Sequence, residues 1–130
     1  MRKIAFAALA TLLASPAFAT QQITCDGIAD NSVHVAIGLG SVPGLAIFST
    51  YIEAKGQSWA IDGMHGGTPI TLVQAAEDGD HMLADFADEN VERIVASVRL
   101  LVAEDSQNRI TVGTLSLPGT GVFGLTCEGP

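Results

Sequence analysis

The sequence predicts a single all-β domain of about eight to nine strands, built as an antiparallel sandwich or a small barrel. Turn-forming pairs such as Pro43-Gly44, Asp78-Gly79 and Pro118-Gly119 recur at short intervals. The segments between them are rich in Val, Ile, Thr and Leu, which favour strands. The two cysteines lie near opposite ends of this region, so a disulfide would join the first strand to the last. We therefore expect a meander of short strands.

Alternation with a period of two is clearest near the start of the domain. Val33, Val35, Ile37 and Leu39 alternate with smaller or polar residues such as His34, so one face of this strand is expected to be buried. The same pattern and the turn positions predict strands at about 22–26, 33–39, 44–53, 57–61, 69–76, 80–87, 92–104, 109–117 and 121–127.

The segment 92–104 also fits a helix, because apolar residues from 91 to 102 recur at helical spacing. A strand is favoured because alternate residues from 94 to 102 are apolar and the tip at 105–108 leads directly into the next apolar run. A helix would also end on two acidic residues, which its dipole disfavours. The alternative fold is a β-sheet with one helix at about 88–104.

Residues 1–19 have the features of a secretory signal peptide. Arg2 and Lys3 precede an apolar run over residues 4–14, and Ala17-Phe18-Ala19 supplies the small residues of a cleavage site. The apolar run is too short to span a bilayer. We expect cleavage to leave residues 20–130 as one exported domain, periplasmic or secreted, with no membrane attachment.

The charge balance narrows the choice of partner. The full chain has a net charge of −8 with histidine neutral. Beyond residue 19, four basic residues face 14 carboxylates, a net charge of −10. Such a surface repels nucleic acid and anionic lipids, and it is suited to a basic protein or a cation. Solubility alone also accounts for an acidic surface.

Cys25 and Cys127 are predicted to form a structural disulfide. An oxidising compartment preserves such bonds, and an intramolecular bond between two cysteines has one possible connectivity. Closing a loop of about 100 residues contributes roughly 4–5 kcal/mol in the chain-entropy treatment. The spacing fits neither a CxxC redox pair nor a thiolate metal site.

Two glycine-containing segments resemble functional motifs without their required context. Residues 119–124 match GxGxxG, but neither a following helix nor the later acidic residue of a dinucleotide site is available. Residues 56–60 resemble a loosened nucleophile elbow around Ser58, which requires an α/β sheet. We therefore expect no cofactor, and we assign Ser58 to a hairpin beside Trp59.

The histidines do not indicate a zinc site. His34, His65 and His81 show neither HxxxH nor HxH spacing. The strand pattern places His34 and His81 on exposed faces and His65 in a glycine-rich loop.

The acidic segment 77–92 is the most unusual feature of the sequence. Asp78, Asp80 and Glu89 occupy the first, third and twelfth positions of a calcium loop, but Met82 and Leu83 stand where a ligand and a glycine are needed. These three carboxylates are retained as incomplete metal candidates. A hairpin with charged edges, which blocks pairing with other sheets, explains the same residues.

Three kinds of function fit these observations. The favoured one is a non-catalytic periplasmic module that binds a ligand or a protein, because no catalytic constellation is visible. An inhibitor of a basic exported enzyme such as a lysozyme is the alternative, supported by charge. The third is an enzyme whose site is assembled from scattered residues such as Ser58, His81 and Asp85.

Overall fold

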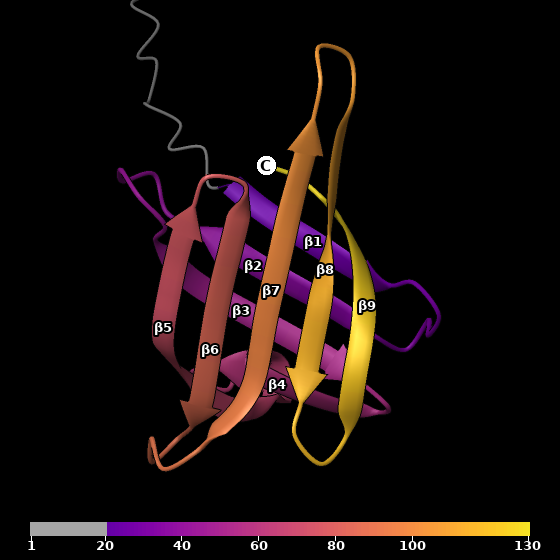
Figure 1. The fold of residues 1–130 in the computed structure, drawn as a ribbon. Helices are drawn as coiled ribbons and strands as arrows, with labels where there is room; N and C mark the ends of the chain where they lie inside the picture. Colours follow the sequence, from indigo (N-terminus) through magenta and orange to yellow (C-terminus); the bar gives the residue numbers. More distant parts are fainter. Residues whose placement is uncertain (1–20) are drawn as a thin grey trace, which may run out of the picture.

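The computed structural model describes residues 21–130, which form a closed barrel (Figure 1). The predicted all-β fold is confirmed, and the barrel is the form adopted. The predicted signal peptide at 1–19 lies outside the described residues. In chain order the strands are β1 (Gln21–Gly27), β2 (His34–Leu39), β3 (Ile47–Ala54), β4 (Gln57–Ile61), β5 (Thr68–Asp78), β6 (His81–Asp88), β7 (Ile94–Glu104), β8 (Arg109–Leu117) and β9 (Gly121–Glu128).

The strands follow a meander, with each strand paired to its neighbours in sequence. The barrel closes where β1 pairs antiparallel with β9. The segment with two interpretations forms β7, which pairs antiparallel with β6 and β8. The alternative helix at 88–104 is therefore wrong. The apolar residues that alternate along this segment face the barrel interior, as expected for a strand.

One step of the meander differs from the expectation, because β4 and β5 pair in parallel. Trp59 aligns with Thr68, and Ile61 aligns with Ile70. The connection contains the short helix η1 (Met64–Gly66), and Asp62 has a left-handed φ of 58°. Asp62 and η1 reverse the chain twice, so β5 runs beside β4 in the same direction, whereas a hairpin would have made the pair antiparallel.

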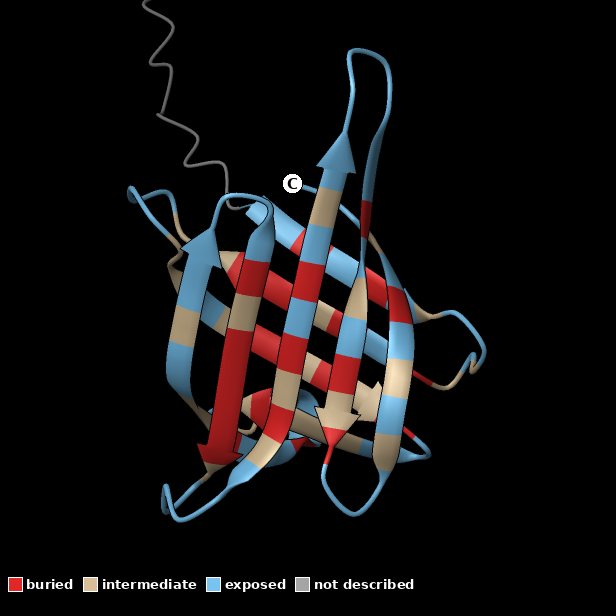
Figure 2. Cartoon of the chain, viewed as in Figure 1, coloured by how far each residue is buried: buried red, intermediate tan, exposed pale blue. Residues whose placement is uncertain are grey.

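The core fills one end of the barrel interior. We call this the closed end; it is the end where β6 and β8 finish and β7 begins, and β4 crosses it in Figure 1. Figure 2 shows an almost continuous buried stretch in β6 that reaches this end. The buried apolar side chains that pack here include Val35, Ile52, Ile70, Phe86 and Leu117. Each removes a large apolar surface from water, which contributes about 1.5–3 kcal/mol per side chain.

Close packing of β7 against β8 depends on a glycine. A Cβ atom at Gly113 would collide with the carbonyl oxygen of Arg99 and would lie 2.7 Å from Cδ2 of Leu100. The glycine thus allows the backbone of β7 to approach β8 closely at this point.

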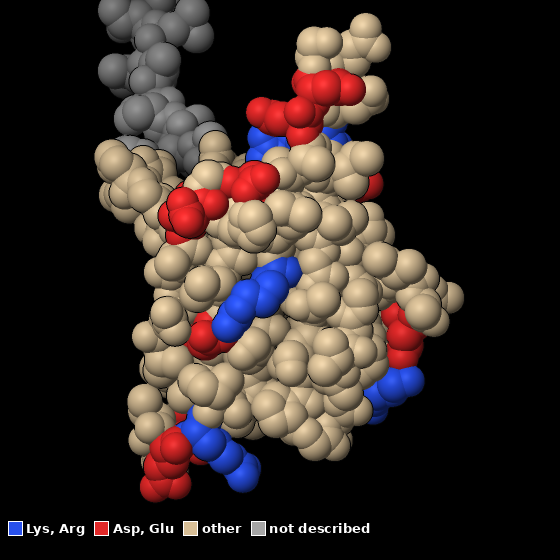
Figure 3. Space-filling view, in the orientation of Figure 1, with Lys and Arg blue, Asp and Glu red and all other residues tan. Residues whose placement is uncertain are grey.

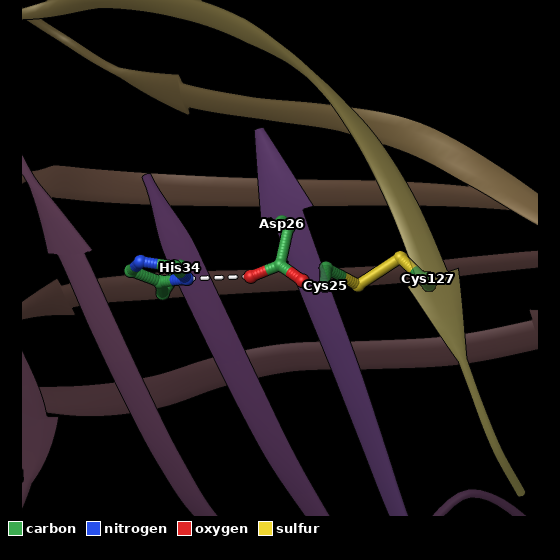
Figure 4. The surroundings of a disulfide bond; sticks show 4 residues. All are labelled: Cys25, Asp26, His34 and Cys127. Atoms are coloured by element: carbon green, nitrogen blue, oxygen red, sulfur yellow. Dashed lines mark hydrogen bonds and ion pairs between the residues drawn. A yellow bond between two sulfur atoms is a disulfide. The ribbon is translucent and has the colours of Figure 1, made fainter. Parts of the chain in front are cut away.

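The predicted disulfide is present. Cys25 of β1 and Cys127 of β9 face each other across the strand pair that closes the barrel, with their Cα atoms 4.0 Å apart (Figure 4). Such bonds persist in oxidising compartments. Residues 21–130 contain no helix with the length and apolar character needed to cross a membrane.

Candidate functional site

A cavity of about 500 Å³ occupies the other end of the barrel, which we call the open end. Here β1, β6 and β8 begin, β5 and β7 finish, and the loop 40–46 joins β2 to β3. The cavity is lined by Gln21, Ile23, Leu39, Gly40, Ser41, Val42, Pro43, Gly44, Leu45, Glu77, Met82, Leu100, Val102, Arg109, Thr111, Gly129 and Pro130.

The cavity wall is mainly apolar and follows from strand alternation. Leu100 and Val102 lie two residues apart on β7, so both point into the barrel. Ile23 of β1 and Met82 of β6 face inward in the same way and are buried. The apolar residues therefore continue the barrel core toward the open end, but they leave space there.

Polar groups lie at the mouth of the cavity. The Nη1 of Arg109 donates a hydrogen bond to Oε2 of Glu104 at 3.3 Å, across the β7–β8 hairpin. Glu77 aligns with the inward-facing Met82, so its side chain lies on the cavity side of β5. Among residues 21–130, no basic side chain lies within ion-pair distance of Glu77.

More carboxylates lie on the turns at this end of the barrel. Asp78 and Asp80 lie at the β5–β6 turn, and Asp105 lies at the β7–β8 hairpin. Figure 3 shows acidic side chains gathered over these two turns. Backbone N–H groups of Gln107 and Asn108 donate to Asp105 and lower the pKa of its carboxyl group. Asp105 lies on the β7–β8 hairpin, which projects beyond the rest of the barrel in Figure 1, whereas Asp78 directly follows the cavity residue Glu77.

The arrangement is suited to binding an amphipathic molecule. An apolar body would displace water from the wall formed by Leu39, Met82, Leu100 and Val102. A polar group on the same molecule would remain at the mouth, where Glu77 lies.

A second hollow, of about 460 Å³, lies on the outside of the barrel against β1, β2 and β3. Tyr51 and His65 line it and contact each other edge to face, with ring centroids 5.7 Å apart. Met64 of η1 also lines it and is 45% exposed. It is a surface feature, because the strand residues that line it, apart from the buried Thr50, face outward.

The structure does not bring the three predicted metal candidates together. Asp78 and Asp80 lie at the open end, whereas Glu89 follows β6 and lies at the closed end. The whole of β6 separates them, which prevents a twelve-residue calcium loop. Residues 21–130 contain no group of three or more His, Cys, Asp or Glu side chains placed to hold a metal ion.

The scattered residues of the enzyme hypothesis also remain apart. Ser58 lies on β4, at the closed end. His81 lies at the open end, where its Nδ1 is 2.6 Å from Oδ1 of Asp80. Asp85 lies on the outer face of β6 and accepts two hydrogen bonds from Arg99. No nucleophile and base meet among these three residues.

His34 and His65 are likewise separate from the cavity. The Nδ1 of His34 lies 2.5 Å from Oδ1 of Asp26 on the neighbouring strand, on the exposed face (Figure 4). His65 has a left-handed φ of 55° in η1.

The residues that line the cavity were not singled out by sequence analysis. Leu100 and Val102 carry the same alternating pattern as residues of the filled core, so the pattern predicts their direction but not the space between them. The one available signal was the presence of the apolar residues Val42 and Leu45 in a segment rich in glycine and proline, and the structure leaves Val42 60% exposed.

Comparison with known proteins provides no family assignment. No protein-family model, curated protein or solved structure shows significant similarity to the chain.

Proposed function

We propose that this protein is an exported, non-catalytic module that binds a small amphipathic molecule in the cavity at the open end of the barrel. The observation that carries this proposal is the cavity of about 500 Å³, which opens at one end of the barrel and has inward-facing apolar residues in its wall. This volume lies within the range of typical small-molecule sites. Export is proposed from residues 1–19, and the Cys25–Cys127 bond supports it.

The cavity favours this function over an inhibitor of a basic enzyme. The acidic residues that suggested an inhibitor lie at both ends of the barrel, for example Asp105 at the open end and Glu89 at the closed end. The apolar lining has no role in recognition of a protein by charge, whereas it is required for a small apolar ligand.

Binding of the neutral dye Nile red, followed by its fluorescence, tests the proposal. The wild-type protein is expected to bind about one dye per chain with an increase in fluorescence, because the cavity shields the dye from water. Val102→Trp places a large side chain in the cavity and should weaken binding at least about tenfold.

Leu101→Trp is the matched control, since Leu101 is the adjacent residue on β7 and is 38% exposed on the outer face. It should bind the dye as the wild type does. Circular dichroism on both variants checks that the barrel forms. Equal binding by two folded variants, or no binding by the wild type, would overturn the proposal.

A further inference from the structure

We propose that the cavity selects molecules with a cationic head group, an amine joined to an apolar body, and that Glu77 recognises the amine. This inference rests on the proposed function and specifies the chemical class of its ligand. It is carried by Glu77, the one acidic residue among residues 21–130 that lines the cavity, and by the charges around it.

The position of Glu77 is the first step of the argument. It is the last inward-facing residue of β5, one position before the strand ends at Asp78. An apolar body against Met82 and Leu100 would place an attached head group near the open end, where Glu77 lines the cavity. A carboxylate accepts hydrogen bonds from an ammonium group, and these bonds are charge-assisted.

The second step is the difference between Glu77 and Arg109, the two charged residues that line the cavity within the described part of the chain. Arg109 is already engaged by Glu104. An anionic head group would meet a guanidinium whose charge is already partly neutralised, and it would be repelled by Glu104 itself. Glu77 has no basic partner among residues 21–130, so an ammonium group would displace only water from it.

The third step is the field around the mouth. Asp78, Asp80, Glu104 and Asp105 are all placed at the turns of the open end, against His81 and Arg109. Figure 3 shows the acidic groups over these turns. The potential at the mouth is therefore negative, which raises the local concentration of cations and repels anions.

Competition for bound Nile red by three ligands with the same chain tests the inference. Octylamine is protonated near pH 7, octanoate is ionised, and octanol is neutral. We expect octylamine to bind about fivefold more tightly than octanol, a ratio typical of a partly exposed ion pair, and octanoate to bind more weakly than octanol. High salt should reduce the preference for the amine, because it screens exposed charges.

Two variants separate recognition by Glu77 from the general charge of the protein. Glu77→Gln should remove most of the preference for octylamine over octanol. Asp78→Asn removes the same charge from the neighbouring, outward-facing position and should keep most of the preference. Both residues are exposed, so neither variant should unfold the barrel.

The outcomes distinguish this inference from the proposed function. If octanol and octylamine displace the dye equally well, or if Glu77→Gln and Asp78→Asn behave alike, the inference is wrong while ligand binding stands. If the dye does not bind to the wild-type protein, the proposed function itself is wrong.

Discussion

The buried carboxylate of Asp85 shows how one residue on the outside of the barrel is stabilised. Its side chain is 12% exposed on β6, and Arg99 of β7 binds both of its oxygens, at 2.8 Å and 3.2 Å. The guanidinium group, together with a hydrogen bond from Ser97, lowers the pKa of Asp85 although burial opposes this change. The pair fastens two neighbouring strands on their outer face.

Asp85→Asn should therefore destabilise the protein in a manner that depends on pH. The folded-state pKa is lowered, so the stabilisation is fully present above the unfolded pKa of about 4 and is lost as pH falls through the lower folded value. Because Arg99 is half exposed and can be hydrated in the variant, we expect a loss of about 1–3 kcal/mol at pH 7.

Urea unfolding of both proteins from pH 7 down to pH 3 measures this difference. The gap in unfolding free energy between the wild type and the variant should narrow below about pH 4. A constant gap over this range would show that lost packing, and not the charge of Asp85, accounts for the effect.

At the scale of elements, the β6–β7 turn contains a residue that is poorly matched to its conformation. Val91 has a left-handed φ of 57°, and it is 56% exposed, so it contributes little to the core. Hydrogen bonds hold the turn in place: the N–H of Val91 donates to the carbonyl of Asp88 at 3.0 Å, and the N–H of Glu92 donates to Oδ1 of Asp88 at 2.8 Å. The surrounding turn thus imposes a conformation that a β-branched residue rarely adopts.

Val91→Asn is expected to stabilise the protein, since Asn tolerates the left-handed region far better than Val. The gain should be about 1 kcal/mol, which corresponds to a rise in melting temperature of about 4 °C. Val122→Asn is the control, because it makes the same substitution at an exposed residue in a strand, where the left-handed conformation plays no part. Its melting temperature should not rise. A melting temperature for Val91→Asn at or below that of the wild type would show that the turn is not strained.

The elements also show where prediction from sequence succeeds and where it stops. The direction of each side chain in β7 follows from a period of two, so the strand itself was predictable. The parallel pairing of β4 with β5 was not, because the glycines and the left-handed residues of this connection, such as Asp62 and Gly63, indicate a turn but not the direction in which the next strand leaves it. The cavity was equally hidden, since Leu100 and Val102 have the sequence pattern of core residues whether or not the space before them is filled.

At the scale of the whole molecule, the barrel depends on the joining of its two ends. The β1–β9 pair that closes it aligns four residues of β1, Thr24–Gly27, with four of β9. The Cys25–Cys127 bond lies within this short pair and links positions 102 residues apart. The disulfide therefore links the two ends of the barrel at a strand pair that is short, with four aligned residue pairs.

Replacing both cysteines, Cys25→Ala with Cys127→Ala, should lower the unfolding free energy by about 2–5 kcal/mol. The cross-link restricts the unfolded chain, so its removal should also expose more surface on unfolding and increase the dependence of the unfolding free energy on urea concentration. Reduction of the wild-type protein should reproduce both effects. Lost packing of the buried Cys25 would lower stability without steepening the urea dependence, so an unchanged slope would contradict the role assigned to the bond.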